Sequence, residues 1–279
     1  MTDRVLALLG TGLVDPYQPV IRADDLGILR GDGIFETLLV REGRAWLLDE
    51  HLDRLVNSAV RMDLAVPSPP EWRELASTAL DAWPADREGV LRLVCTRGPE
   101  AGGPPTVYAT IAAVPAETLR QRATGIEVIT RPLGLPADVR QDAPWLLGGV
   151  KTTSYAVAMA VLRDARRQAA DDVIWTSLEG EVLEGPTATV VWAVGQTLHT
   201  IPAETGILEG TTVDHLMTQA PRHGFGTARS RAAVADLHAA DALWLLSSVR
   251  GAAAVRAIDG RPRGDAGLTG RIRGALGPA

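Results

Sequence analysis

Lys151 is the only lysine in the chain. Lysine and arginine together number 28 among the 279 residues, so every other residue of the pair is an arginine. Arginine supplies positive charge equally well, but its guanidinium stays protonated and is a poor nucleophile, so it cannot form a Schiff base. Lys151 also has no acidic neighbour in the stretch from Gly148 to Tyr155. The residue is therefore a candidate for covalent chemistry. A stray surface lysine in an arginine-biased chain is an equally good interpretation.

A lysine that bonds to pyridoxal phosphate (PLP) needs companions of two kinds. A carboxylate must keep the pyridine nitrogen protonated, so that the ring acts as an electron sink. The phosphate needs an arginine, hydroxyl groups or a helix N-terminus. Glu184 can supply the carboxylate and Arg54 the cation. The remaining groups are Thr211 and Thr212 after Gly210, with Ser247 and Ser248. Each also has an ordinary interpretation, as a solvated arginine, helix-capping threonines or turn serines.

Other kinds of site fail on spacing. A phosphate-binding P-loop requires glycine directly before the lysine, where this chain has Val150. Gly10-Thr11-Gly12 begins like a dinucleotide fingerprint, but Asp15 stands where the third glycine belongs. The five histidines show no metal-ligand spacing, so we expect no metal site. Cys95 lies in an apolar run, which favours an inert buried thiol over a nucleophile.

Short strands and helices alternate along the chain and must position these residues. We expect strands at 5–9, 34–40, 45–48, 90–96, 106–114, 125–130, 172–177, 182–184, 189–194 and 242–247, and helices at 52–62, 71–83, 155–169 and 211–220. Residues 67–70 predict a break, and the Gly/Arg-rich sequence after 251 predicts no element. The polar stretch 115–123 predicts a linker. It divides a smaller N-terminal α/β domain, 1–114, from a larger C-terminal domain, 124–279.

Composition narrows the class of partner. The net charge is −6 and there is no basic tract, so nucleic acid is not an expected partner. No stretch approaches the roughly 20 apolar residues that span a bilayer. A single cysteine excludes an intramolecular disulfide, which suits a reducing cytoplasm. We therefore expect a cytoplasmic protein that acts on a small molecule.

The order of the motifs resembles the class IV PLP-dependent aminotransferases, which include branched-chain and D-amino-acid aminotransferases and aminodeoxychorismate lyases. The motifs are Gly31-Asp32-Gly33-Ile34-Phe35-Glu36-Thr37, His51-Leu52-Asp53-Arg54-Leu55, Lys151, Glu184-Gly185, Gly210-Thr211-Thr212 and Ser247-Ser248. The resemblance runs from about Asp24 to Ile258. It implies an α/β (mixed α+β) fold of PLP fold type IV, like that of D-amino-acid aminotransferase. The family has two domains with the cofactor in the cleft between them, and its members are usually homodimers.

The resemblance also assigns roles. Lys151 is similar to the Schiff-base lysine and proton shuttle, and Glu184 to the partner of the pyridine nitrogen. Tyr155 is similar to the tyrosine that hydrogen-bonds the cofactor's phenolic oxygen, one residue closer to the lysine than usual. The phosphate-binding positions match Arg54, Thr212 and Ser248, with a backbone N–H from Thr211. The family usually has asparagine five residues after the glutamate, where this chain has Thr189.

The resemblance leaves the reaction open between two chemistries. In the D-amino-acid enzymes an Arg and a His trap the substrate carboxylate in the loop after Thr-Arg-Gly, and the loop after Gly98 here lacks both. The run from Phe35 to Thr37 resembles aminodeoxychorismate lyases, which release pyruvate and 4-aminobenzoate, a folate precursor. Thr37 is a candidate substrate contact or an ordinary strand threonine. The lyase is our first hypothesis. An aminotransferase acting on branched-chain or D-amino acids, which Tyr155 favours, is the second, and a non-catalytic PLP-binding protein the third.

Overall fold

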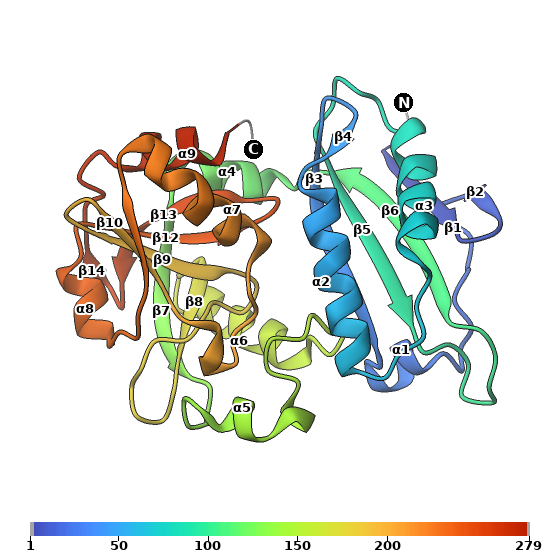
Figure 1. The fold of residues 1–279 in the computed structure, drawn as a ribbon, viewed down its shortest axis with the longest axis horizontal. Helices are drawn as coiled ribbons and strands as arrows, with labels where there is room; N and C mark the ends of the chain where they lie inside the picture. Colours follow the sequence, from blue (N-terminus) through green and yellow to red (C-terminus); the bar gives the residue numbers. More distant parts are fainter. Residues whose placement is uncertain (1–2, 278–279) are drawn as a thin grey trace. The chain divides into compact units, whose positions relative to one another are not determined.

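The computed structural model describes residues 3–277 and divides into two compact units (Figure 1). The first unit holds the chain up to Pro115 together with Val150–Tyr155. The second holds Ala116–Gly149 and the chain from Ala156 onward. Lys151 therefore belongs to the N-terminal unit, whereas the expected boundaries placed it in the C-terminal domain. Every helix within residues 3–277 is too short or too polar to span a membrane.

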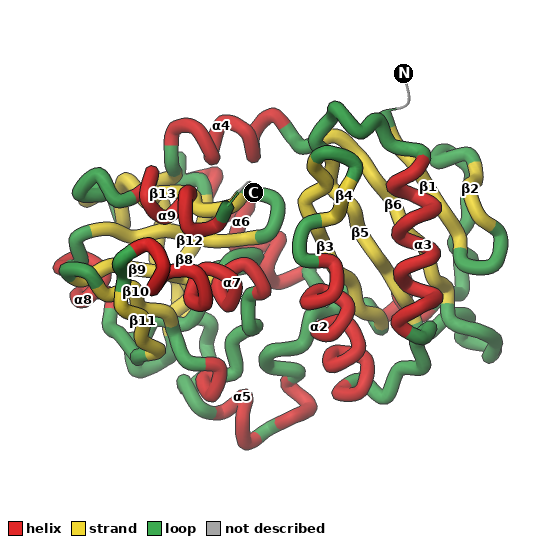
Figure 2. Tube along the Cα trace, turned by 45° about the horizontal axis from the view of Figure 1, so that its top comes forward, coloured by secondary structure: helices red, strands yellow, loops and turns green. Residues whose placement is uncertain are grey.

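The first unit is built on a six-stranded sheet in the order β2-β1-β6-β5-β3-β4, and every neighbouring pair is antiparallel. The strands are β1 (Arg4–Leu8), β2 (Gly12–Val14), β3 (Gly33–Arg41), β4 (Arg44–Ala45), β5 (Gly89–Thr96) and β6 (Thr106–Ala113). Helices α2 (Leu48–Arg61) and α3 (Pro69–Asp81) cover one face of this sheet (Figure 2). The short helix α1 (Leu26–Arg30) precedes β3.

Period-2 alternation along β3 separates the two faces of this sheet. Ile34, Glu36 and Leu38 are fully buried, and Ile34 and Leu38 pack in the core with residues of α2 and α3. Phe35 and Thr37 alternate with them and are only partly buried. The face of β3 that carries Phe35 and Thr37 is therefore the one that α2 and α3 leave open.

Two local expectations in this unit were wrong. The break expected at 67–70 is the start of α3. Ser68 and Glu71 form a capping box, and Pro69 and Pro70 stand in the first turn, where a missing N–H costs nothing. The strand expected at 45–48 is cut short because β4 ends at Ala45 and α2 begins at Leu48.

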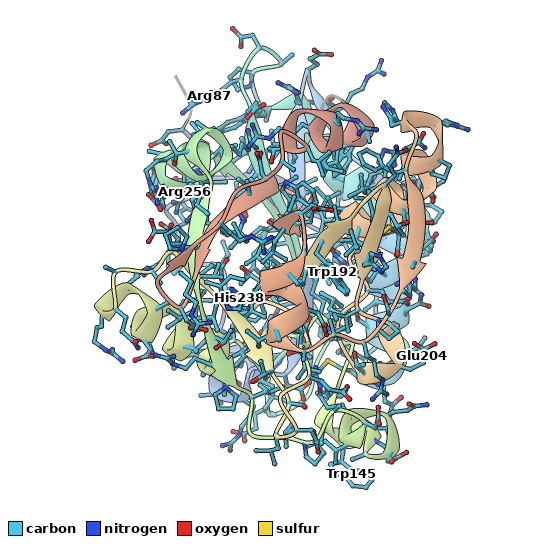
Figure 3. All side chains as sticks on the ribbon, turned by 90° about the vertical axis from the view of Figure 1, so that its left-hand side faces the viewer. Arg87, Trp145, Trp192, Glu204, His238 and Arg256 are labelled. Carbon is cyan, nitrogen blue, oxygen red and sulfur yellow. The ribbon has the colours of Figure 1, made fainter. Side chains whose placement is uncertain are left out.

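The second unit is built on a mixed sheet in the order β11-β10-β9-β12-β13-β7-β8, with β14 paired to β13. The strands are β7 (Ile126–Pro132), β8 (Asp172–Thr176), β9 (Thr189–Val194), β10 (Thr197–Thr200), β11 (Gly226–Arg229), β12 (Ala242–Ser247), β13 (Gly251–Ile258) and β14 (Arg261–Pro262). The helices are α4 (Ala116–Thr124), α5 (Val139–Asp142), α6 (Ala156–Arg167), α7 (Thr211–Gln219), α8 (Val234–Ala239) and α9 (Thr269–Leu276). Trp192 lies in the core on β9, and Trp145 lies at the periphery near α5 (Figure 3).

Two segments of this unit differ from the expectation. The stretch expected as a linker forms α4, which packs against β13. Its polarity reflects an exposed helix rather than an unstructured connection. The Gly/Arg-rich end also folds. Ala252, Ala253 and Val255 of β13 are buried, and so are Ile272 and Leu276 of α9. The strand β13 was not recognised because most of its buried residues are alanines, and alanine has no marked preference for strands.

Candidate active site

Lys151 is fastened along β3 by its backbone. Its carbonyl oxygen accepts a hydrogen bond from the N–H of Phe35 at 3.2 Å, and its own N–H donates to Ser58 Oγ on α2 at 3.3 Å. Thr152 continues the contact as a bridge partner of Ile34. Because β4 pairs only with Val40 and Arg41, the side of β3 near its start is open to this returning segment. The position of Lys151 is thus set by strand-like pairing rather than by an exposed loop.

The amine of Lys151 lies beside the aromatic ring of Phe35. Its Nζ lies 4.6 Å from the centroid of the Phe35 ring, within the range of a cation–π contact. The Tyr155 ring meets the Phe35 ring edge-on, with centroids 5.1 Å apart and an angle of 76° between the planes. Thr37 projects from the same face of β3 as Phe35. The structure therefore gathers Lys151, Tyr155 and Thr37 on the open face of the first unit.

Arg54 belongs to a buried ionic cluster on the opposite face of β3. Its Nε and Nη2 donate to the two carboxylate oxygens of Glu36, each at 2.7 Å. His51, one turn earlier on α2, lies 2.6 Å from Glu36 Oε2 through Nδ1. Glu36 and His51 are fully buried, and the Arg54 side chain is 14% exposed. The bidentate geometry holds the guanidinium in one orientation.

The electrostatics of this cluster keep Glu36 charged. Burial alone raises the pKa of a carboxyl group, but the charge and hydrogen bonds of Arg54, with the hydrogen bond of His51, lower the pKa of Glu36 to about 2. Burial lowers the pKa of His51 against the opposing pull of Glu36. Glu36 is therefore an anion beside a neutral histidine and a permanent cation.

The remaining predicted residues lie around the ends of two interior strands of the second unit, where β9 begins and β12 ends. Thr189, the first residue of β9, is the register partner of Leu246 near the end of β12. A Cβ on Gly210 would lie only 2.5 Å from Thr189 Oγ1, so the residue that caps α7 must approach β9 without a side chain. Thr189 thus occupies the position of the usual asparagine by packing against the start of α7. Thr211 and Thr212 open that helix.

Glu184 lies five residues before the start of β9. Its carbonyl oxygen accepts from the N–H of Trp175 on β8, and a tight turn from Gly185 to Ala188 then delivers the chain to β9. Its side chain is 17% exposed. One carboxylate oxygen, Oε2, accepts a hydrogen bond from the N–H of Leu208 at 3.0 Å. The other, Oε1, accepts hydrogen bonds from Nη1 and Nη2 of Arg140. The carboxylate is therefore held at both oxygens.

Ser248 carries an unused hydroxyl group. The residue is 9% exposed, and within residues 3–277 its Oγ is buried without a hydrogen-bond partner. A buried hydroxyl without a partner costs free energy, so such a group in a folded protein points to a missing ligand. Thr211 and Thr212 are also buried, and they form the first turn of α7.

Comparison with known proteins identifies the family. The family model for amino-transferase class IV matches residues 33–258. A relative from Mycobacterium tuberculosis, described as a bifunctional aminodeoxychorismate lyase / D-amino acid transaminase, is 46% identical over 258 residues, which is 89% of each chain. The chain belongs to the class IV aminotransferase family.

Solved structures agree with this membership. A hypothetical aminotransferase from Mycobacterium tuberculosis in its PLP-bound form is 43% identical, with a TM-score of 0.95 over 98% of this chain and 97% of the other. A fold IV-transaminase from Curtobacterium pusillum is 36% identical, with a TM-score of 0.93 over 99% and 97% of the two chains. The expected fold of type IV is confirmed. This class IV family member is a PLP-dependent enzyme.

The residues at the start of α7 and after β12 fit a phosphate ester. Phosphate presents several acceptor oxygens and negative charge, which match a helix N-terminus and a hydroxyl without a partner. Thr211, Thr212 and Ser248 supply these groups. The Arg54 guanidinium, also expected at the phosphate, is held by Glu36 in the first unit.

Several residues around these positions were missed by sequence reasoning. Glu36 was recognised only as part of a motif, although a charged residue among alternating apolar positions indicates a buried partner. His51 and Arg54 are three residues apart, which makes them neighbours on one helix face, and both contact the Glu36 carboxylate. Arg140 had no sequence signal beyond its charge. Cys95, by contrast, is fully buried as expected, and burial raises its pKa to about 12.

Proposed function

We propose that this class IV enzyme is a 4-amino-4-deoxychorismate lyase, which releases pyruvate and leaves 4-aminobenzoate. The observation that carries the proposal is the environment of Arg97, the residue best placed in sequence to trap a substrate carboxylate. Its Nε and Nη2 donate to Asp32 at 2.7 and 3.2 Å, and its Nη1 and Nη2 donate to the carbonyl oxygens of Asp63 and Met62 after α2. Arg97 is therefore committed to holding the end of α2.

The loop that follows offers no replacement. Residues 99–105 contain no arginine, lysine or histidine, so they cannot supply the carboxylate trap that the resemblance assigns to D-amino-acid aminotransferases. A lyase has less need of that trap because it does not exchange two amino acids through one site. The substrate and the sum of the two products have the same composition, so no amino acceptor enters the reaction.

Arg92 offers a cation in a different place. It is exposed on β5 and is the direct register partner of Thr37, so both side chains project from the open face that carries Phe35. A guanidinium binds a carboxylate with two parallel hydrogen bonds. We assign Arg92 to a carboxylate of the substrate and Thr37 to a neighbouring polar group. Sequence reasoning overlooked Arg92 because one arginine among many carries no signal.

The other residues take roles that follow from their surroundings. Bound PLP supplies an electron sink that stabilises negative charge on the substrate. Lys151 Nζ is the attachment point for the cofactor and afterwards carries the substrate proton. Tyr155 orients the aromatic surface beside that amine. Glu184 would hold the pyridine nitrogen, and Thr211, Thr212 and Ser248 would hold the phosphate, with Arg54 as the further cation that the resemblance assigns to it.

Transamination is the second candidate. The relative from Mycobacterium tuberculosis carries both activities in its description, and Tyr155 matches a tyrosine of branched-chain members. An enzyme with Arg92 as its carboxylate site could accept an amino acid there in place of 4-amino-4-deoxychorismate. The test below therefore also measures transamination from D-alanine.

Three further proposals concern the oligomeric state, the cellular location and the domains. We propose that the enzyme is a homodimer and acts in the cytoplasm, consistent with its single buried cysteine. We also propose that the two compact units are the two domains expected for the family, with Lys151 carried by the N-terminal one.

Product analysis tests the activity. PLP-loaded enzyme is incubated with 4-amino-4-deoxychorismate and no amino acceptor. We expect 4-aminobenzoate and pyruvate in equal amounts over many turnovers, and none from the Lys151→Ala variant. If the wild type instead forms no product but converts D-alanine and 2-oxoglutarate to pyruvate and glutamate, the enzyme is a transaminase and the lyase proposal is wrong.

A further inference from the structure

Arg140 stands directly behind Glu184 in the second unit. It lies on α5, and its Nη1 and Nη2 approach Glu184 Oε1 at 3.3 and 3.4 Å. The two side chains are only 13% and 17% exposed. Since the Leu208 N–H holds the other oxygen, Arg140 completes a clamp that fixes the rotation of the carboxylate.

Two glycines from separate loops make room for this arginine. A Cβ on Gly148 would lie 2.7 Å from Arg140 Cβ, and a Cβ on Gly206 would lie 2.6 Å from the same atom. Contacts this short do not occur between real carbon atoms, so any side chain at either position would push Arg140 away from Glu184. Gly206 also has φ of +73°, which other residues adopt at a cost. The local sequence is therefore built around the Arg140 side chain.

The charge of Arg140 affects which group holds a proton. A partly buried carboxylate without a cation tends to become protonated, because burial disfavours its charged form. Arginine remains charged at any accessible pH, so a neighbouring guanidinium keeps such a carboxylate ionised. If Glu184 instead took up the proton, it could no longer hold one on a ring nitrogen beside it.

We infer that Arg140 is a positioning residue that keeps Glu184 ionised and correctly turned, so that the ring nitrogen of PLP carries the proton. The inference rests on the proposed function in one respect, the assignment of Glu184 to that nitrogen. Arg140 does not itself touch the cofactor in this scheme. Its effect must therefore depend on the nitrogen atom, which gives the test its selectivity.

The test compares two ligands of the apoenzyme: PLP, and the analogue with carbon in place of the ring nitrogen. Affinities are measured for the wild type, Arg140→Gln, Arg140→Lys and the control Arg131→Gln, which removes a partly exposed ion pair with Asp164 elsewhere in the unit. We expect Arg140→Gln to bind PLP roughly tenfold more weakly and the analogue almost unchanged. Arg140→Lys should retain most of the preference for PLP, and Arg131→Gln all of it.

A spectroscopic measurement makes the result independent of affinity. The ¹⁵N chemical shift of ring-labelled PLP on the enzyme reports whether the nitrogen is protonated. We expect the shift to move toward the unprotonated value in Arg140→Gln and to stay at the wild-type value in Arg131→Gln.

Two outcomes would overturn the inference. One is an equal loss of affinity for PLP and the analogue in Arg140→Gln, which would give the arginine a purely structural role. The other is an unchanged ¹⁵N shift. Failure of the proposed site looks different: wild-type enzyme would then bind the two ligands equally well, and Glu184→Gln would not alter that. When the wild type prefers PLP, either of the two outcomes above in Arg140→Gln rejects the inference and leaves the proposed site standing.

Discussion

Glu36 is a fully buried carboxylate whose charge is maintained by residues of α2. Its folded pKa is about 2, against 4.5 for an ordinary glutamate. A carboxyl group with a depressed pKa contributes stability that is complete above its unfolded pKa and is lost as the pH falls through its folded pKa. His51 acts in the same direction, because its folded pKa lies below the ordinary 6.5 and acid favours the unfolded chain that can take up the proton.

Acid should therefore destabilise the fold in two stages. We expect the free energy of unfolding to decline below about pH 6.5 as His51 resists protonation, and to decline further from about pH 4.5 toward pH 2 as Glu36 does. Urea midpoints of the apoenzyme measured from pH 8 to pH 3 check this. The variant His51→Gln should lose the upper stage only. Midpoints that stay level down to pH 4 would contradict the assignment.

Removing the cation of the cluster should cost more than removing the whole pair. In Arg54→Met, Glu36 remains buried without its bidentate partner, and breaking a buried pair in this way costs roughly 3–5 kcal/mol. The double variant Glu36→Gln with Arg54→Met should recover part of that loss. Denaturant unfolding of the three proteins measures both values. A double variant no more stable than Arg54→Met would show that the ion pair is not the source of the loss.

Arg92 should affect substrate binding more than turnover. Replacing it by glutamine removes a charge-assisted contact worth roughly 1.5–3 kcal/mol, so we expect KM for 4-amino-4-deoxychorismate to rise at least tenfold, with a small change in kcat. The control is Arg87→Gln, because Arg87 lies over the Trp83 ring in the same unit. Equal KM values for wild type and Arg92→Gln would place the carboxylate elsewhere.

At the scale of elements, residues of α4 and β8 hold the turn from Ser247 into β13 in place. Arg250 is buried and donates from Nη1 to Asp172 at the start of β8, at 2.7 Å, and to Gln121 on α4, at 3.2 Å. Arg122, also on α4, donates to the carbonyl oxygen of Val249. Ser248 directly precedes these two anchored residues in the chain. The segment expected as a linker thus helps to position Ser248, a proposed phosphate ligand.

Asp172→Asn should loosen this turn. The substitution keeps the shape of the side chain but leaves Arg250 as a buried cation without its anion, so we expect a loss of roughly 3 kcal/mol in unfolding free energy and weaker PLP binding. The control Asp164→Asn removes a more exposed pair with Arg131, and such pairs contribute about 0–1 kcal/mol. Wild-type PLP affinity in Asp172→Asn would separate the anchor from the site.

Elements with a strong periodic pattern could be predicted, and those with a weak one could not. Branched and aromatic residues in β3, β5 and β9 gave strands within one or two residues of those observed. The alanine-rich β13 and the polar α4 had no such pattern, and their burial depends on the rest of the unit. Pro69 and Pro70 indicated a break because proline interrupts helices, although it also begins them.

At the scale of the whole molecule, residue type and order predicted candidate residues but not their surroundings. The single lysine, the glutamate and the helix that opens with two threonines were proposed as site residues in this way, and their roles stay predictions. Their partners depend on pairings between distant segments, such as residues 150–153 along β3 and Arg140 behind Glu184. The sequence also gives no sign that residues 150–155 return to the first sheet, because that return depends on tertiary pairing with β3.

The central claim is that Lys151 holds PLP, and the chain offers an unusually clean test of it. With one lysine in 279 residues, borohydride reduction of the PLP-loaded enzyme should add a single pyridoxyl group per chain, recorded as the intact mass. Peptide mapping should place that group on Lys151, and Lys151→Arg should show no added mass. A reduced adduct at the N-terminal amine instead, or a full adduct in Lys151→Arg, would contradict the account.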